Sequence, residues 1–300
     1  MTTTAKIIAD SINPYGKRIT TFELEYPRMV HSEYMTHRVF SRNAASSRAI
    51  PVNTVIGIVE SNPAFPASWG KNRAGMQATE LLSDDYQVAA KNTWLRARDA
   101  AVECAKEMVS LGVHKQIVNR LLEPFLHIKV VMTTTEYANW DWLRNHKDAD
   151  PTIALLAVEM QKARNESEPV QLAKNHWHVP YVEQQFVLGK QIFFDENGKQ
   201  ITLEQALKIS ASSCAQVSYR KLDTGLEKAE TIFERLIESE PVHASPVEHC
   251  AKVCDCDDYT GVTSVSTRDD LEYELRLNSG NFTGGWIQYR QLIPNNVKFD

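Results

Sequence analysis

The alternation of apolar and polar residues predicts strands at three places in the chain. Residues 20–26 read TTFELEY and put three apolar side chains on one face, the period-2 pattern of a half-buried strand that Pro27 ends. Residues 126–134, LHIKVVMTT, are β-branched and mostly apolar, as in a buried strand. A further strand is expected within PVEHCAKVCDC, residues 246–256.

Helical spacing and helix-forming composition predict the remaining regular elements. Residues 84–111 are rich in Ala, Leu, Met, Glu and Lys, and Gly112 stands where a C-terminal cap belongs. Pro151 suits the first turn of another helix, because its missing N–H would be unpaired there anyway. The predicted helices cover residues 29–40, 84–111, 136–144, 151–164, 203–213 and 225–239.

Three irregular stretches interrupt this pattern. Residues 57–80 contain three glycines and two prolines and predict a long surface loop or lid. Residues 166–200 look like an insertion that carries a hairpin around the turn DENGK. The end of the chain, residues 278–296, is expected to form one short helix with loops. No internal repeat is visible, and residues 1–300 are interpreted as a single domain.

Composition narrows the class of protein. The chain has 300 residues, of which 43% are hydrophobic, enough for a sizeable core. No run approaches the roughly 18 apolar residues that span a bilayer, and the start lacks a secretory signal, so we expect a cytoplasmic protein with no membrane partner. The net charge of −5 disfavours a nucleic acid polymer as a partner. Five unevenly spread cysteines are expected to be reduced thiols.

Hydrogen-bond donors are concentrated in residues 36–48, THRVFSRNAASSR. Arginine binds phosphate bidentately, and serine hydroxyls with loop N–H groups can complete an oxyanion site. A nucleotide phosphate is therefore a natural ligand for this segment. The alternative is a solvated basic loop, because arginine and serine are mostly exposed in any protein.

This segment resembles the signature of flavin-dependent thymidylate synthases. His37, Arg38, Ser46 and Arg48 match the family's pattern. Two positions depart from it, because Thr36 replaces the leading arginine and Ala44 replaces a glutamate.

Two further segments resemble the same family. EYANWDWLR, residues 136–144, matches a helix that carries Asn139 and Arg144, and NRLLEP places Arg120 at a nucleotide-binding arginine. HASPVEH, residues 243–249, matches the family's entry into a strand. A serine in AQVSY, Ser218, matches one that the family places near its cofactor.

The order of these segments differs from the usual one, because the HASPVEH match comes about 200 residues after the arginine motif instead of before it. The chain therefore resembles a circularly permuted member, of a kind found among viral proteins, which would act in the host cytoplasm. The resemblance implies an α/β fold with helices packed on a mainly antiparallel sheet. It also implies a homotetramer with active sites between subunits.

The resemblance implies a flavoenzyme that moves a one-carbon unit from methylenetetrahydrofolate to C5 of dUMP, with FAD as cofactor and NADPH as reductant, and without a cysteine nucleophile. Arg144 is then the catalytic residue, a fixed cation against the uracil ring. The substrate-binding residues are Glu33, Ser46, Ser47, Arg48 and Arg120. Gln288 and Arg290 are added to this set, because the tryptophan, glutamine and arginine of GGWIQYRQ suit a base and a phosphate. The flavin-binding residues are His37, Arg38, Asn43, Asn139, Ser218, His243, Ser245 and Glu248.

Three alternatives remain open from the sequence. His243, His249, Cys250, Cys254 and Cys256 could form a zinc site, although alternation along a strand need not bring them together. The departures at Thr36 and Ala44 could also change the product, for example to a hydroxymethylated pyrimidine nucleotide. A nucleotide-binding homologue without catalysis is the third alternative.

Overall fold

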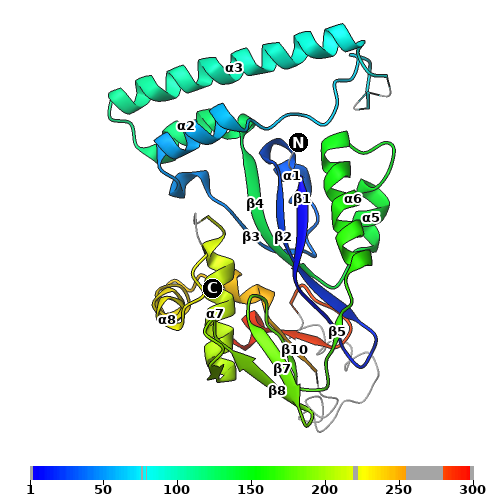
Figure 1. Cartoon of the computed structure of the whole chain (residues 1–300), viewed down its shortest axis with the longest axis vertical. Helices are drawn as coiled ribbons and strands as arrows, with labels where there is room; N and C mark the ends of the chain where they lie inside the picture. Colours follow the sequence, from blue (N-terminus) through cyan, green and yellow to red (C-terminus); the bar gives the residue numbers. More distant parts are fainter. Residues whose placement is uncertain (1–2, 76, 79, 219–221, 255–279, 298–300) are drawn as a thin grey trace.

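The computed structural model describes residues 3–75, 77–78, 80–218, 222–254 and 280–297. Its main element is a five-stranded sheet in the order β3-β4-β2-β1-β5, antiparallel except for the short β1–β5 pair (Figure 1). The strands are β1 Thr4–Ile12, β2 Arg18–Pro27, β3 Ser41–Ala44, β4 His127–Thr134 and β5 Val170–Gln171. The predicted α/β class, with helices packed on a mainly antiparallel sheet, is confirmed.

One face of this sheet is apolar and is covered by helices. Phe22, Leu24 and Tyr26 of β2 pack with Met132 of β4 and with Trp140 in a fully buried core. The covering helices are α1 His31–Tyr34, α5 Ala138–Arg144 and α6 Pro151–Glu166. Asp150 caps α6 by accepting hydrogen bonds from the first backbone N–H groups of the helix.

The opposite face carries a row of hydroxyl side chains at a single level of the sheet. Thr133 lies opposite both Ser41 and Thr21 in the strand register, and residues directly opposite each other project to the same face. All three are fully buried, and each is hydrogen bonded. We call Ser41, Thr133 and Thr21 the hydroxyl row.

A second layer docks on the hydroxyl row through polar side chains, which include Asn281, whose Nδ2 donates to Ser41 Oγ at 3.1 Å. Gln288 Nε2 donates to Ser41 Oγ at 2.8 Å. The ring nitrogens of His249 and His178 lie 2.9 Å and 2.8 Å from the hydroxyls of Thr133 and Thr21. Each hydroxyl of the row therefore binds a side chain from a different segment of the second layer.

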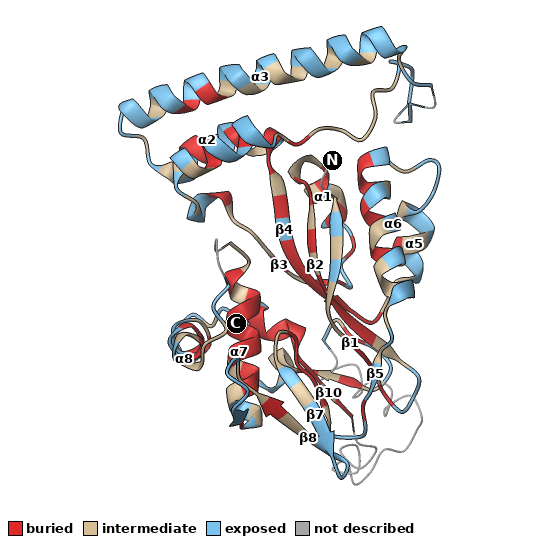
Figure 2. Cartoon of the chain, viewed as in Figure 1, coloured by how far each residue is buried: buried red, intermediate tan, exposed pale blue. Residues whose placement is uncertain are grey.

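This second layer consists of two small sheets and the helices beside them. The small sheets have the strand orders β11-β10-β6 and β7-β8-β9. Their strands are β6 Trp177–His178, β7 Glu183–Val187, β8 Lys190–Phe194, β9 Gln200–Ile201, β10 Ala251–Val253 and β11 Trp286–Gln288. The helices are α7 Leu203–Ala215, which is largely buried (Figure 2), and α8 Leu226–Phe233, which continues as a π-helical turn at Glu234–Glu238.

A third group of helices extends from the β3 edge of the sheet. It contains α2 Val52–Ser61, the long α3 Asp84–Ser110, whose outer face is exposed (Figure 2), and α4 Lys115–Val118. Short 3-10 turns connect the elements: η1 Arg28–Val30, η2 Ser47–Ala49, η3 Asn119–Phe125, η4 Gln216–Ser218, η6 Ser245–His249 and η8 Tyr289–Leu292. No helix among the described residues is long and apolar enough to span a bilayer.

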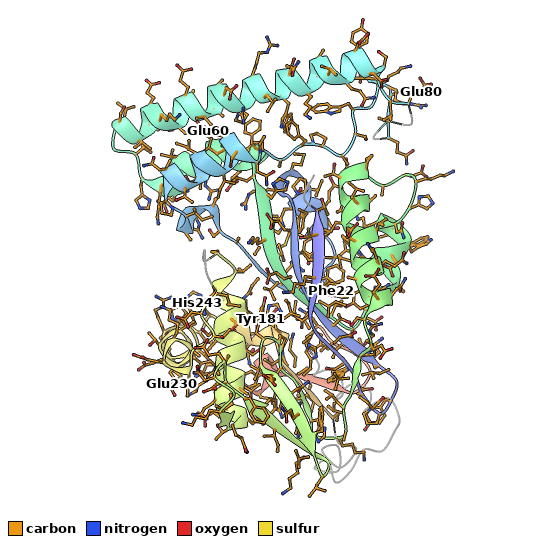
Figure 3. The ribbon with its side chains drawn as sticks, in the orientation of Figure 1. Phe22, Glu60, Glu80, Tyr181, Glu230 and His243 are labelled. Atoms are coloured by element: carbon orange, nitrogen blue, oxygen red, sulfur yellow. The ribbon has the colours of Figure 1, made fainter. Side chains whose placement is uncertain are left out.

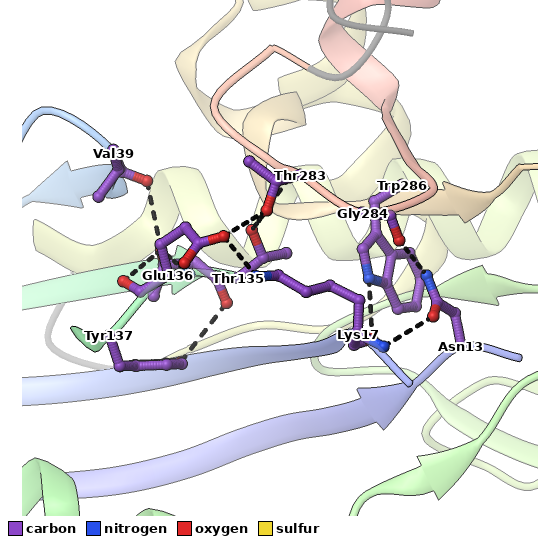
Figure 4. Close-up of polar contacts among 10 residues, drawn as sticks. Asn13, Lys17, Val39, Thr135, Glu136, Tyr137, Thr283, Gly284 and Trp286 are labelled. Carbon is purple, nitrogen blue, oxygen red and sulfur yellow. Dashed lines mark hydrogen bonds and ion pairs between the residues drawn. The ribbon is translucent and has the colours of Figure 1, made fainter. Parts of the chain in front are cut away.

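The turn before β11 packs tightly on the β1–β2 hairpin (Figure 4). Gly284 has φ +68°, and a Cβ there would come within 2.7 Å of Lys17 Cγ, so only glycine fits this contact. Asn13 Nδ2 donates to the Gly284 carbonyl at 2.8 Å, and Trp286 Nε1 donates to the Lys17 carbonyl at 3.1 Å. Lys17 also pairs with Glu136, at the entry to α5.

Several predicted elements are confirmed with small changes at their ends. They are the strands at 20–26 and 126–134, the helices at 84–111, 136–144, 151–164, 203–213 and 225–239, and the hairpin around DENGK.

The structure differs from the other element predictions in several places. The helix predicted over 29–40 is reduced to α1, because the Arg42 guanidinium binds the carbonyls of the turn that follows it. The N-terminal strand β1 was missed, since a bulge between Ile7 and Ala9 interrupts its alternation. Helix α2 occupies the first part of the predicted 57–80 loop. The strand predicted within 246–256 is present as β10, but the residues before it form the turn η6. The predicted short C-terminal helix is reduced to the 3-10 turn η8, which follows β11.

Replacing Thr133 with valine tests the docking of the two layers. The change keeps the shape but removes the hydroxyl that binds both Thr21 and His249, and it leaves buried polar groups unpaired. We expect the free energy of unfolding, measured by urea denaturation, to fall by about 1–3 kcal/mol. Thr93→Val on the exposed surface of α3 is the matched control and should change it by less than about 0.5 kcal/mol. Equal effects of the two changes would contradict the role of the row.

Candidate functional site

Arg144 at the end of α5 directly contacts residues 33–37, at the start of the arginine- and serine-rich segment. Its Nε donates to His37 Nε2 at 3.0 Å, and its Nη2 donates to Thr36 Oγ1 at 3.2 Å. Its Nη1 lies 3.5 Å from Glu33 Oε2. The structure thus brings together three predicted site residues, Arg144, His37 and Glu33, from two distant segments.

His37 is held as a neutral imidazole. It is 6% exposed and contacts two rings, Phe40, which is stacked on it with 5.7 Å between the ring centres, and Trp140, which meets it edge-to-face with 4.7 Å between the ring centres. Burial, with the positive charges of Arg144 and Arg42, lowers the pKa of His37 from 6.5 to about 4. Its Nε2 is therefore unprotonated at neutral pH and can accept the hydrogen bond from Arg144.

The turn that presents His37 is fixed by Arg42. The Arg42 guanidinium donates to the carbonyls of His37 at 3.1 Å and Phe40 at 2.7 Å. Thr134 Oγ1 also donates to the Val39 carbonyl at 3.3 Å, which ties the turn to the end of β4 (Figure 4). The arginines of residues 36–48 were expected to bind a phosphate, so this internal role of Arg42 was not predicted.

A pocket of ≈ 550 Å³ opens beside Arg144 and Glu33, between α1, α5 and the loop that leads to α6. Trp142, which is 73% exposed, forms part of its wall. Asp148 and Asp150 also line it, so that carboxylates outnumber the Arg144 cation. Burial and the nearby Asp150 raise the pKa of Glu33, against the lowering effect of Arg144. The pocket suits a ring with both donors and acceptors better than a phosphate.

Several of the predicted phosphate-binding residues form a second group in the turns η2 and η3. Ser47 Oγ donates to Glu123 at 2.5 Å, and Asn119 Nδ2 donates to the Ser47 carbonyl at 2.7 Å. These bonds hold η2 against η3 and bring the neighbouring residues Arg48 and Arg120 to one region. Both guanidiniums are exposed, and neither pairs with another residue in the described part of the chain.

Ser46 and Ser218 join this second group. The Ser46 amide donates to Ser218 Oγ at 2.9 Å. Ser47 and Ser218 line a smaller pocket of ≈ 190 Å³ between β4, α2 and η4. On β3, Asn43 is buried and donates its side-chain amide to the Cys214 carbonyl of α7 at 3.2 Å.

The HASPVEH segment forms the turn η6 and lies against β3. Gln288 Nε2 donates both to Ser41 Oγ and to the Glu248 carbonyl, at 2.8 Å and 2.9 Å. The Glu248 carboxylate is paired with Arg290, a predicted substrate-binding residue. His243 and Ser245 are exposed, and His243 lies beside α8 in the lower part of the molecule (Figure 3).

The structure therefore divides the predicted site into separate groups within one chain. Arg144, His37 and Glu33 lie on the side of the helix-covered face. Ser47 and Ser218 line a pocket that shares no residue with the one beside Arg144. Figure 1 shows α5 and α6 on the β1 side of the sheet, with α2 and the segment before it at the β3 edge.

Four of the residues predicted to bind flavin have side chains available for a ligand. They are Arg38, Asn139, His243 and Ser245, all exposed and without a side-chain hydrogen bond to any residue that the structure describes. The other four, His37, Asn43, Ser218 and Glu248, are engaged in the internal contacts given above.

The zinc alternative finds no cluster in the described residues, which contain no group of three or more His, Cys, Asp or Glu side chains placed to hold a metal. His249 is instead bonded to Thr133, and the Cys250 thiol donates to Ser210 Oγ at 3.2 Å. Cys256 lies outside the described residues.

Comparisons with known proteins find similarity to solved structures alone. No family model and no curated protein matches it. Among solved structures it is similar to the UMP/dUMP methylase PolB from Streptomyces cacaoi bound with 5-Br UMP, with a TM-score of 0.46 and 16% identity over 55% of this chain and 89% of that one. The same methylase bound with 5-Br dUMP aligns with a TM-score of 0.42 and 20% identity, over 51% and 69%. Similarity of this degree assigns neither family nor activity.

The pKa of His37 tests the Arg144 contact. In the wild type, NMR titration of the imidazole should give a value of about 4, and Arg144→Ala should raise it because a repelling cation is lost. His31, lowered to about 4 by burial, Arg28 and Arg42, is the internal control and should not move. An unchanged His37 in the variant would contradict the contact.

The same shift predicts a pH dependence of stability. The folded pKa of His37 is about 4 and the ordinary value is 6.5, so the unfolded chain binds more protons in this window. The contribution of His37 to the free energy of unfolding is therefore complete above pH 6.5 and decreases as the pH falls toward 4. A His37→Gln variant should show a smaller slope across this window in urea denaturation, and an equal slope would contradict the assignment.

Proposed function

We propose that this chain is a flavin-dependent enzyme that transfers a one-carbon unit from methylenetetrahydrofolate to C5 of dUMP to form dTMP. The contact of Arg144 with His37 and Glu33 is the observation that carries the proposal. It joins two of the motif segments that resemble flavin-dependent thymidylate synthases, although His37 and Arg144 are 107 residues apart. The contact lies at a pocket of ≈ 550 Å³, within the size range of small-molecule sites.

Glu33 and Arg144 together complement the imide edge of uracil. This edge presents an N–H donor beside carbonyl acceptors, and a carboxylate accepts where a guanidinium donates. The two side chains lie 3.5 Å apart at the same pocket. The exposed Trp142 offers an aromatic surface for the ring. The pair can therefore orient uracil by hydrogen bonds without a covalent bond to the protein.

Arg144 is proposed to stabilise the negative charge on the uracil carbonyl oxygens in the enolate form of the ring, in which C5 is the nucleophile toward the one-carbon unit. A preorganised cation is effective because it needs no reorganisation at the moment of reaction. His37, Thr36 and Glu33 hold the guanidinium from three sides. Because His37 is neutral, it orients the guanidinium without adding a second positive charge.

A cysteine nucleophile is not part of the proposal. Of the four cysteines among the described residues, three are buried. Burial raises the pKa of Cys250 to about 12 and that of Cys214 well above its ordinary value. Thiols of this kind stay protonated at neutral pH and are poor nucleophiles. Cys104 is exposed on α3 and does not line the Arg144 pocket.

The available donors fit a flavin. Guanidinium, amide, imidazole and hydroxyl groups can bind the ring carbonyls and the pyrophosphate of FAD, and Arg38, Asn139, His243 and Ser245 supply these groups with free side chains. Bound flavin would supply the redox chemistry, with NADPH as its reductant. The residues of the chain would hold and orient it.

We also propose that the complete site forms between subunits of a homotetramer. Arg144 and the free cations Arg48 and Arg120 belong to different groups in one chain. A second copy could bring its Arg48 and Arg120 to the nucleotide held by Arg144, where two cations would bind the phosphate.

The first test is spectroscopic. The purified protein should be yellow with flavin absorbance, bleach with NADPH, and reoxidise when dUMP and methylenetetrahydrofolate are added. The mass of the product should correspond to dTMP. A hydroxymethylated product would favour the alternative reaction, and a protein that binds no flavin would contradict the proposal.

The second test removes the cation. Arg144→Ala should lower kcat for dUMP conversion by about 10²–10³-fold, the cost of losing one electrostatic stabiliser of a transition state. Flavin absorbance should be retained, because Arg144 is not among the proposed flavin contacts. Arg96→Ala on the exposed face of α3 is the matched control and should leave kcat unchanged. Wild-type turnover by Arg144→Ala would remove the central residue of the mechanism.

A further inference from the structure

A separate pocket of ≈ 520 Å³ lies beneath α3, between the segment after α2, the first turns of α6 and the end of the main sheet. It shares no lining residue with the pocket beside Arg144. It does share Asn62 and His127 with the smaller pocket that contains Ser47 and Ser218. The function proposed above gives this pocket no role.

Hydrogen bonds to η3, α3 and α6 fix the segment after α2, which forms one side of the pocket. The Ala64 amide donates to the Phe125 carbonyl at 2.8 Å, and Trp94 Nε1 of α3 donates to the Ala64 carbonyl at 3.0 Å. The Ala67 amide donates to Thr152 Oγ1 of α6 at 3.1 Å. The pocket is therefore bounded by anchored backbone on the side of this segment.

Aromatic rings form part of the wall. Phe65 and Trp69 line the pocket. Trp69 packs edge-on against Trp94, with 6.1 Å between the ring centres. Val88 and Leu155, which are 59% and 40% exposed, add aliphatic surface around the same opening. Exposed apolar surface gathered in a concave site favours an apolar, planar ligand.

One cation lies among these apolar groups. Lys91 Nζ is 5.2 Å from the centre of the Phe65 ring. It makes no ion pair with any carboxylate that the structure describes, whereas Lys71 pairs with Glu80 and Lys106 pairs with Glu60. Figure 3 labels Glu80, in the loop before α3, and Glu60, on α2. None of the lining residues is Asp or Glu, although the whole chain has a net charge of −5. The electrostatics of this pocket therefore favour an anion, in contrast to the acidic pocket beside Arg144.

We infer that this pocket binds a second ligand, a planar heteroaromatic molecule that carries a phosphate or carboxylate group. The ring would stack on Phe65 and Trp69, and the anionic group would pair with Lys91. A nucleotide and a pterin carboxylate share this chemistry. The inference does not depend on the proposed reaction, because it uses none of the residues assigned to it.

Binding of adenosine 5′-monophosphate and of folic acid, measured by isothermal titration calorimetry on the full chain, tests the inference. At least one probe should bind, and Lys91→Ala should weaken its binding roughly tenfold or more, as expected for loss of a charged partner. Lys106→Ala removes the same charge from the same helix outside the pocket and should leave the affinity unchanged. Trp69→Leu should also weaken binding, since it removes the stacking surface.

The outcomes are distinct. Binding of adenosine 5′-monophosphate identifies a nucleotide site, and binding of folic acid alone identifies a pterin carboxylate site. Binding should persist in Arg144→Ala, so that failure of the proposed reaction and failure of this inference can be told apart. Absence of binding by both probes at millimolar concentration, or equal effects of Lys91→Ala and Lys106→Ala, would overturn the inference. The inference would also be overturned if neither probe bound and Trp69→Leu changed the oligomeric state. The pocket would then be an interface between copies of the chain.

Discussion

The hydrogen bonds between the hydroxyl row and the second layer are the constraint on which the rest of the structure depends. Ser41, Thr133 and Thr21 are buried on the sheet face opposite the apolar core, where a hydroxyl is tolerated only if it is bonded. Gln288, His249 and His178 satisfy them. This requirement fixes η6, β6 and β11 relative to β3 and β4, and so it sets where the segments around residues 40 and 245 meet.

The main sheet separates two groups of predicted site residues. The apolar face anchors α5 and α6, and through them the cluster of Arg144, His37 and Glu33. The other face leads through β3 to the free cations Arg48 and Arg120. In the proposed function, the acidic, ring-sized pocket on one side would hold the base, and the cationic region on the other would hold the phosphate. This division gives a physical reason for the proposal that two copies complete one site.

Local patterns were sufficient to predict much of the fold, and the failures have identifiable causes. The helix over residues 84–111 and the strand over 126–134 were predictable because their own composition and periodicity decide them. The turn after α1 was not, because the helix ends where the Arg42 side chain binds the carbonyls of His37 and Phe40, and the spacing of apolar residues carries no signal for such a contact. Similarly, the motifs indicated Arg144 and His37 separately, but their contact depends on tertiary packing around Trp140. The hydroxyl row has no sequence signal, since isolated threonines and serines are usually exposed.

The most direct test of the account is a crystal structure of the protein with dUMP and FAD. The account predicts that the uracil edge lies within hydrogen-bond distance of Arg144 and Glu33, and that Arg48 and Arg120 of a second copy bind the phosphate of the same nucleotide. A nucleotide bound in every subunit away from Arg144, with the pocket beside α5 left empty, would contradict it.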